Sequence, residues 1–286
     1  MPCERYAGAD PVRVIDLEHV GTPRAIGVWQ VEDVLVDCGP ESCTERLLAE
    51  LGDWRPRALL LTHIHLDHSG AAGALVRRWG DLEVYVHERG APHLIDPERL
   101  ARSVARLYGD DMKRLWGEVV PVPEANVRAL AGGERLGPFR VAYTPGHASH
   151  HVSFLHEHTG TAFVGDVAGV RIMPHRLTLP HAPPPDIDLP AWRDSLDAVR
   201  AWGATRLALP HFGIVEEVDE QLDHVWERLN AKAELAGRLD EREFVEHSRA
   251  ELAAELPPED IAVYLQTSPP DHMHAGLRRY LERRAG

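Results

Sequence analysis

The sequence predicts an α/β protein that ends in a helical appendage. Through residue 215, short β-branched and apolar runs alternate with helical stretches, a pattern typical of sheets covered by helices. From residue 216 onward the strand patterns almost vanish, and acidic stretches with helical spacing continue to residue 286. We therefore expect an α/β domain over residues 1–215 and a helical extension over residues 216–286.

Both element types occur in the first half of the α/β part. Strands are expected where residues are β-branched, alternating or continuously apolar, at 12–17, 25–31, 34–36, 58–61 and 82–86. Helices are expected where apolar residues recur every three to four positions, at 40–51, 71–79 and 96–116. The last of these helices is longer than its neighbours.

The second half continues the same pattern up to residue 215. Further strands are expected at 127–130, 139–143, 152–155, 161–164 and 207–209. A proline-rich loop at 180–190 precedes a helix at 191–202. In the C-terminal part, helices are expected at 216–235, 241–256 and 274–284, and the pairs Pro257-Pro258 and Pro269-Pro270 punctuate them.

Composition excludes several classes of protein. The 286-residue chain carries a net charge of −14, which disfavours nucleic acid as a partner. No stretch approaches the roughly 18 apolar residues of a membrane-spanning helix, and the first six residues lack the features of a signal peptide. Cys3, Cys38 and Cys43 form neither a metal-binding spacing nor an even disulfide set. We therefore expect a cytoplasmic protein with no membrane partner.

Histidine is unusually frequent, with 18 residues, and the strongest signal is the segment Thr62-His63-Ile64-His65-Leu66-Asp67-His68. Histidine and aspartate supply the nitrogen and oxygen ligands that suit zinc and related divalent metals. Because side chains alternate along an extended segment, His63 and His65 point the same way and can hold one ion. A turn at Ser69-Gly70 would let Asp67 and His68 face a second ion.

Three more candidate ligands each follow a predicted strand at a glycine or proline. They are His147 in Thr144-Pro145-Gly146-His147, Asp166 in Val164-Gly165-Asp166, and His211 in Leu209-Pro210-His211. A sheet fixes the geometry of side chains at its strand ends, so these positions are suited to metal ligands. Together with the first segment they complete a coordination set.

The motif His63-x-His65-x-Asp67-His68, followed by His147, Asp166 and His211, resembles the metallo-β-lactamase fold superfamily over about residues 12–215. Asp37 also matches an aspartate that this family keeps after an early strand. The resemblance implies an αββα sandwich of two sheets with helices outside. It implies one metal held by His63, His65 and His147, and a second metal held by Asp67, His68 and His211. Asp166 would bridge the two, together with a water or hydroxide.

Such a pair of metals accounts for hydrolysis in chemical terms. Two ions ~3.5–4 Å apart share a water and lower its pKa toward ~7, and the hydroxide attacks an acyl or phosphoryl centre. Asp67 could also shuttle the proton to the leaving group. Asp37 is expected to accept a bond from a ligand histidine and fix its tautomer, with an ordinary turn aspartate as the alternative. We expect two divalent ions, with zinc first and iron or manganese as alternatives.

Differences from known branches of the superfamily narrow the range of expected substrates. An aspartate at the bridging position argues against a true β-lactamase, and His65 differs from the glutamate of flavodiiron proteins. The segment around His211 differs from the Cys-Gly-His-Glu-Tyr segment of glyoxalase II, which puts glutathione thioesters in doubt. Acyl-homoserine lactonases carry a tyrosine soon after the position of Asp166, and none follows here. We expect a hydrolase of a small ester, thioester or lactone. The alternatives are a phosphodiesterase of the same fold and a non-catalytic metal-binding sensor.

Several residues outside the ligand set are weaker candidates. Arg171 could hold a substrate carboxylate or phosphate, or it could be a surface arginine. The 96–116 helix could wall the site, with Tyr108 or Trp116 touching substrate, or only pack on its own core face. Two histidines, His150 and His151, could lie near the metal site or only be packed or solvated. The 180–190 loop with His181 could border the cleft or be a stiff connector. A third metal at His272 and His274 is a further alternative. The helical extension could cap the cleft or form a homodimer interface.

Overall fold

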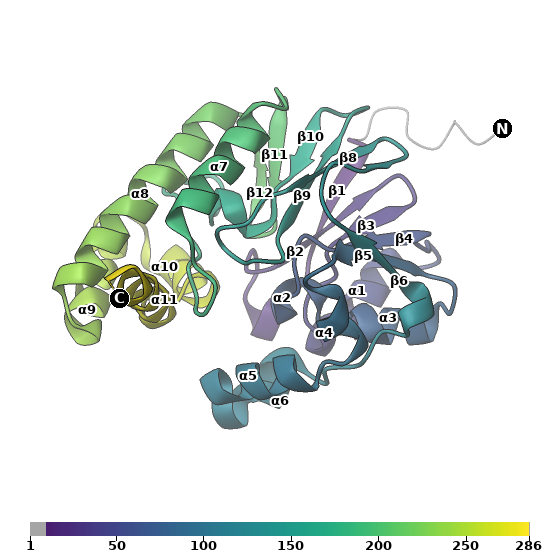
Figure 1. Cartoon of the computed structure of the whole chain (residues 1–286), viewed down its shortest axis with the longest axis horizontal. Helices are drawn as coiled ribbons and strands as arrows, with labels where there is room; N and C mark the ends of the chain where they lie inside the picture. The colour runs from purple at the N-terminus through teal and green to yellow at the C-terminus, as the bar shows by residue number, and fades with distance from the viewer. Residues whose placement is uncertain (1–9, 286) are drawn as a thin grey trace.

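The computed structural model describes residues 10–285 and consists of two β-sheets packed face to face, with helices on the outer face of each (Figure 1). This arrangement confirms the αββα sandwich with C-terminal helices. Cys3 and the first six residues, on which the signal-peptide expectation rests, lie outside the described residues. Within residues 10–285, no helix is long and apolar enough to cross a membrane.

The first sheet has six strands that lie in sequence order. They are β1 (Val12–Asp16), β2 (Gly27–Val31), β3 (Val34–Val36), β4 (Ala58–Leu60), β5 (Glu83–His87) and β6 (Val127–Leu130). Strands β1 to β3 pair antiparallel, whereas β3 to β6 run parallel. Parallel neighbours need crossover connections, and helices supply them here. These helices are α1 (Thr44–Leu51), α2 (Leu66–Ser69), α3 (Ala72–Arg78), α4 (Ala91–Ile95), α5 (Glu98–Tyr108) and α6 (Met112–Trp116).

The second sheet also has six strands, in the order β12-β11-β10-β9-β8-β7. They are β7 (Arg135–Leu136), β8 (Phe139–Tyr143), β9 (Val152–His156), β10 (Thr161–Phe163), β11 (Arg206–Leu209) and β12 (Gly213–Val215). Only the β10–β11 pair is parallel among these, and helix α7 (Leu189–Arg200) makes its crossover. Strands β7 and β12 are too short to show a clear sequence pattern.

Apolar side chains fill three layers. Trp29, Phe139, Phe154 and Phe163 are buried between the two sheets. Helices α1 and α3 pack on the outer face of the first sheet, and α7 packs on the outer face of the second, where Trp192 is fully buried. This double-sided burial explains why β4 and β10 read as continuous apolar runs.

The C-terminal helices share both outer cores with the α/β part. They are α8 (Val218–Arg238), α9 (Glu241–Glu255), α10 (Pro258–Thr267) and α11 (Pro270–Ala285). Leu222 and Val225 of α8 pack with α7 and the second sheet, whereas Tyr264 of α10 belongs to the core of the first. The Tyr264 hydroxyl accepts a hydrogen bond from the Ile172 amide at 3.0 Å. The division at residue 215 stays a prediction.

Two helix expectations were wrong in detail. The single helix expected at 96–116 is divided into α5 and α6 by a short 3-10 turn that begins at Gly109, whose φ is +52°. The pairs Pro257-Pro258 and Pro269-Pro270 separate helices as expected, but Pro258 and Pro270 are themselves the first residues of α10 and α11. Helix α10 was therefore not expected, and the expected start of the last helix, at 274, lies four residues too late. Proline is well tolerated at a first helical position, because its missing amide would be unpaired there anyway.

Candidate metal centre

The seven predicted ligands meet at one edge of the sandwich, where strands from both sheets end. His63 and His65 follow β4 of the first sheet, and Asp67 and His68 lie in α2 directly after them. The other three ligands follow strands of the second sheet: His147 after β8, Asp166 after β10 and His211 after β11. The amide of Val152 donates to the carbonyl of Thr62 at 2.8 Å and joins the two sheets beside the site.

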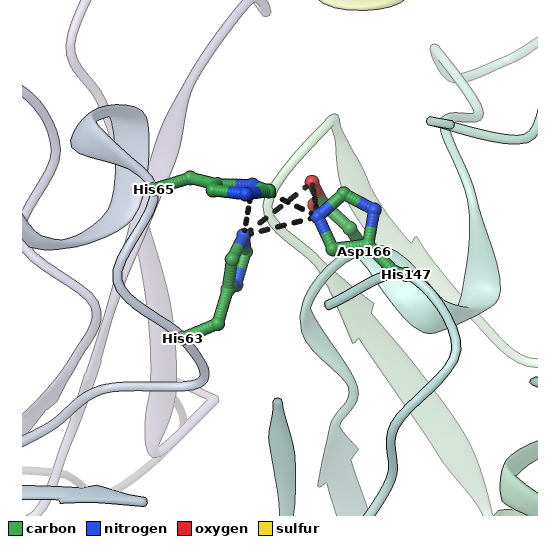
Figure 2. A group of neighbouring side chains, drawn as sticks. All are labelled: His63, His65, His147 and Asp166. Carbon is green, nitrogen blue, oxygen red and sulfur yellow. Dashed lines mark hydrogen bonds and ion pairs between the residues drawn. The ribbon is translucent and has the colours of Figure 1, made fainter. Parts of the chain in front are cut away.

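The first group consists of His63, His65, His147 and Asp166, whose side chains point toward one another (Figure 2). The Nδ1 atom of His65 lies 3.0 Å from Nε2 of His63 and 3.0 Å from Nε2 of His147. The two Nε2 atoms are 3.3 Å apart. Three imidazole nitrogens that converge in this way form a ready-made site for one cation.

The second group consists of Asp67, His68, His211 and, again, Asp166. Asp67 Oδ2 lies 3.5 Å from Nε2 of His68 and 3.5 Å from Nε2 of His211. Asp166 presents one oxygen to each group. Its Oδ1 lies 3.3 Å from His68 Nε2, and its Oδ2 lies 3.5 Å from His147 Nε2.

Unpartnered polar atoms show that these residues fit metal ions. Among the described residues, both carboxylate oxygens of Asp166 and the Nε2 atoms of His68 and His211 are buried without a hydrogen-bond partner. Asp166 is within ion-pair distance of both imidazoles, but the groups are not oriented for hydrogen bonds. Buried polar atoms without partners are costly, and one cation in each group would satisfy them.

The remaining ring nitrogens of four of the histidines are held by hydrogen bonds to the protein. Nδ1 of His68 lies 2.8 Å from Asp37 Oδ2, so the contact expected for Asp37 is present. The other three are His63 with Thr62 Oγ1 at 3.1 Å, His147 with the His181 carbonyl at 2.7 Å, and His211 with the Ala25 carbonyl at 2.6 Å. Such outer contacts orient the rings and leave the inward nitrogens free to bind metal.

Together, burial and neighbouring charges lower the pKa values of the histidines in the first group and raise those of His68 and His211 in the second. Burial, together with the nearby histidines, holds the pKa of His63 well below its usual value, and burial likewise lowers the pKa of His147. These imidazoles therefore stay neutral, which is the form that binds metal.

In the second group, burial alone would raise the pKa of each carboxyl group. His68 and His211 outweigh that effect and pull the pKa of Asp67 and Asp166 well below the usual range. Burial would lower the pKa of His68, but the carboxylates of Asp166, Asp67 and Asp37 raise it well above normal. Without a cation, a proton on His68 balances the carboxylates, and a bound metal would take over that role.

A cavity of about 590 Å³ opens beside the two groups, and His65 and Asp67 form part of its lining. Much of the remaining lining is apolar or aromatic, including Leu66, Leu100, Val104, Leu115 and Trp116. Polar residues, among them His19, Arg89 and Asp186, also line the cavity. A cavity with apolar walls and a few polar groups is the usual form of a small-molecule site.

Helices α5 and α6 form one wall of this cavity, as expected for the 96–116 segment. Tyr108 lies with its ring centroid 5.1 Å from that of Trp116, and Trp116 stacks on His19 at 5.3 Å. Burial raises the pKa of Tyr108, so its hydroxyl stays protonated. Both aromatic residues line the cavity, although contact with a substrate remains a prediction.

The C-terminal helices supply another wall. Gln266, Thr267, Pro269 and His272 line the cavity, and the His272 ring lies 5.5 Å from that of Tyr108. Of the two roles considered for the helical extension, the structure therefore shows the one at the cleft.

The expectation for Arg171 was wrong. Its side chain is 2% exposed, and its guanidinium donates to the His175 carbonyl at 2.9 Å and to Gln221 Oε1 at 3.3 Å. The guanidinium is thus engaged by the protein and joins the loop after Asp166 to helix α8. Proximity to Asp166 in the sequence does not fix whether a loop side chain points to the cavity or to the core, and Arg171 points into the core.

The other candidate histidines either line the cavity or form hydrogen bonds outside its lining. His150 and His181 line the cavity, so the 180–190 loop borders the cleft. His151 accepts a hydrogen bond from the Asp166 amide at 3.2 Å, and burial lowers the pKa of its ring to about 3. His272 lines the cavity, whereas His274 contacts the Leu239 carbonyl at 3.2 Å, so these two do not converge on a third metal.

Some residues at the site gave little signal in the sequence. Thr62 bonds both Asp37 and His63, and its position directly before the first ligand was the available clue. His19 and Gln266 are far from every motif in the sequence, and only the folded chain brings them to the cavity.

Comparisons with known proteins identify the family of the chain. Residues 32–211 match the sequence profile of the metallo-beta-lactamase superfamily, which covers more than half of the chain and all seven predicted ligands. The fold resembles the crystal structure of ST1585, an archaeal metallo-beta-lactamase superfamily protein from Sulfolobus tokodaii. That comparison has a TM-score of 0.70 and 22% identity, and it covers 96% of this chain and 100% of that one.

Two curated relatives carry more specific names. An atrochrysone carboxyl ACP thioesterase of Aspergillus fumigatus is 28% identical over 234 residues, 78% of this chain and 60% of the relative. The hydroxyacylglutathione hydrolase GloC of Haemophilus influenzae is 29% identical over 150 residues, 49% of this chain and 64% of the relative. The chain thus spans about three fifths of the length of these relatives. On its profile match, its sandwich fold and its ligand clusters, the chain belongs to the metallo-beta-lactamase superfamily.

Proposed function

We propose that this protein is a dinuclear metal-dependent hydrolase that acts on a small ester, thioester or lactone. The observation that carries the proposal is the shared carboxylate of Asp166, which faces both histidine groups beside a cavity with an apolar and aromatic wall. Superfamily membership and hydrolase-named relatives support a metallo-hydrolase. Cavity and metal groups meet at His65 and Asp67, so a substrate carbonyl in the cavity would lie next to the ligands.

The two groups of candidate ligands would form two metal sites. His63, His65 and His147 would hold one ion, Asp67, His68 and His211 the other, and Asp166 both. Zinc suits this donor set, with iron and manganese as alternatives. Two ions so held would supply a water of lowered pKa as the nucleophile and an electrophile for the scissile carbonyl.

The chain itself would orient the substrate and handle the proton. Asp67 is a ligand candidate that also lines the cavity, and its side chain is 14% exposed. Its carboxylate, which its neighbours keep ionised, would accept the proton of the attacking water and deliver it to the leaving oxygen or sulfur. The apolar walls would exclude bulk water from the acyl group.

The cavity favours a thioester among the three substrate classes. Its aromatic and aliphatic walls suit an acyl chain, and two exposed arginines, Arg89 and Arg99, also line it. In a chain with a net charge of −14, these two guanidiniums offer local binding to an anionic thiol carrier. One relative is named a thioesterase and another a hydroxyacylglutathione hydrolase, which supports this order.

A metal-dependent substrate screen tests the proposal. The purified protein is stripped with a chelator, reloaded with zinc, manganese or iron, and assayed on acyl thioesters, esters, lactones and bis-p-nitrophenyl phosphate. We expect metal-dependent cleavage of thioesters and a lower metal content and rate in Asp166→Ala, with Asp194→Ala, a change at an exposed residue of α7, as the control. Cleavage of the phosphodiester alone would make the protein a phosphodiesterase. A metal-loaded protein inert on every class would make it a binding or sensor protein.

A further inference from the structure

A separate group of metal-binding residue types lies at the other end of the sandwich. It consists of Glu32, His156 and His158, each offering one donor atom within 4.8 Å of the others. His156 is the last residue of β9, whose first residue, Val152, adjoins the metal centre. At ~3.3 Å per residue, strand β9 separates the two places by roughly 13 Å.

The three side chains come from both sheets. Glu32 lies in the turn between β2 and β3 of the first sheet, whereas His156 and His158 lie at the turn between β9 and β10 of the second. The Glu32 carboxylate is thus placed across the open end of the sandwich from the two histidines. An ion held by all three would join the two sheets at this end.

The distances between their donor atoms resemble those in the first group of the candidate metal centre. Glu32 Oε1 lies 3.1 Å from His156 Nε2 and 3.2 Å from His158 Nδ1. In that first group, the corresponding nitrogen pairs are 3.0, 3.0 and 3.3 Å apart. Around a tetrahedral zinc with bonds of about 2.0–2.2 Å, donor atoms lie roughly 3.3–3.6 Å apart. The two Glu32 contacts are slightly shorter than this spacing, and the donor nitrogens of His156 and His158 lie within 4.8 Å of each other, so side-chain adjustment alone would let the three donors surround an ion.

The histidines differ in exposure in a way that suits an anchored but accessible site. The side chain of His156 is 1% exposed, and its Nδ1 lies 2.9 Å from Thr159 Oγ1, which fixes the ring with Nε2 toward Glu32. The side chain of His158 is 70% exposed and that of Glu32 42% exposed. A fixed buried ligand beside two exposed ones leaves a path for an ion and room for a water as fourth ligand.

We propose that Glu32, His156 and His158 form a third metal site, which takes a divalent transition metal of the zinc type and braces the two sheets. Imidazole and carboxylate ligands with an open fourth position match zinc, and nickel or copper would also accept this donor set. The site is structural, because it lies away from the cavity and from Asp166. It does not depend on the function proposed for the catalytic centre.

Zinc binding to wild type and two surface variants tests this site. His158→Ala and Glu32→Gln each remove one ligand at an exposed position, so both variants should fold. His247→Ala, an exposed histidine of α9, is the matched control. After equilibration with excess zinc and removal of unbound metal, we expect each ligand variant to retain one zinc equivalent per chain less than wild type and the control.

Two further measurements complete the test. Zinc added to protein whose other sites are already filled should raise the Tm of wild type and His247→Ala by roughly 3–8 °C, and leave that of His158→Ala unchanged. A zinc-soaked crystal should show an anomalous peak between Glu32 and the two histidines. Equal zinc content in wild type and both ligand variants, with no such peak, would show that the three residues only hydrogen-bond to one another and would overturn the proposal.

Discussion

The side-chain amide of Gln266 donates a hydrogen bond to the backbone carbonyl of His19 across 3.2 Å, although 247 residues separate the two in the sequence. His19 in turn stacks on Trp116, so the first sheet, helix α6 and the C-terminal helix α10 meet at one wall of the cavity. The C-terminal helices are therefore a structural part of the candidate active site.

Removing the C-terminal helices should abolish folding. A chain that ends at residue 215 would expose the apolar surfaces that Leu222, Val225 and Tyr264 cover on both outer cores. We expect this fragment to be insoluble, or to bind hydrophobic dyes and lack a cooperative thermal transition. A soluble, active fragment would show that the α/β part folds without these helices. It would favour a different role for them, such as dimerisation.

Asp260→Asn should destabilise the protein at neutral pH. Asp260 of α10 pairs with Arg24, and its Oδ2 lies 2.6 Å from His175 Nε2. The hydrogen bond from His175, and then Arg24, hold the pKa of Asp260 below its usual value of 3.8. A lowered pKa stabilises the fold above pH 3.8, and this contribution is lost as the pH falls through the folded-state value.

We expect this variant to lose about 1–3 kcal/mol in the free energy of unfolding at pH 7, measured by urea titration. The difference from wild type should shrink progressively below about pH 4. Glu259→Gln, a change at the exposed neighbour on the same helix, is the control and should leave the stability unchanged. A constant difference at all pH values would show that the charge of Asp260 is not what stabilises this contact.

Asp37→Asn should weaken metal binding without unfolding the chain. Asp37 accepts hydrogen bonds from the Thr62 amide at 2.8 Å and from the ring of His68 at 2.8 Å. The amide oxygen of asparagine still accepts one bond, but the loss of charge makes His68 a poorer ligand. We expect the affinity to fall about 10–100-fold, measured by competition with a chromophoric chelator. Asp53→Asn, at an exposed position, should bind metal as wild type does.

Asp67→Asn should lower turnover more than metal content. If the Asp67 carboxylate carries the proton to the leaving group, kcat should fall about 10²–10⁴-fold, while much of the metal remains bound through His68, His211 and Asp166. Parallel measurement of kcat and metal content separates the two effects. A variant that keeps both metals and full turnover would exclude this role.

Trp116→Ala should raise KM for substrates with large acyl groups. Trp116 and Tyr108 line the cavity, and removal of one aromatic wall should cost ~1.5–3 kcal/mol of binding, roughly 10- to 150-fold in KM. The effect should decline as the acyl group is shortened, with little change in kcat. Tyr108→Phe retains its ring and serves as the control. Equal effects on short and long acyl groups would show that the wall does not contact the acyl chain.

The sequence by itself determined the fold class and identified the candidate metal ligands. His63, His65, Asp67 and His68 are recognisable because they lie within six consecutive positions after a buried strand, so local geometry alone brings them to the same strand end. His147, Asp166 and His211 could be found because each follows a strand, and strands of a sandwich end at a common edge. The fold class followed from the same alternation of strands and helices.

The tertiary structure alone decided what the rest of the chain does around these residues. It buried Arg171 against Gln221, broke the 96–116 helix at Gly109, and brought Gln266 to the cavity. It also placed Glu32 beside His156, from the other sheet. The helix break is a local effect of the left-handed backbone at Gly109. The other three outcomes depend on contacts between segments far apart in sequence, whose packing is set by the whole core and leaves no periodic or local pattern to read.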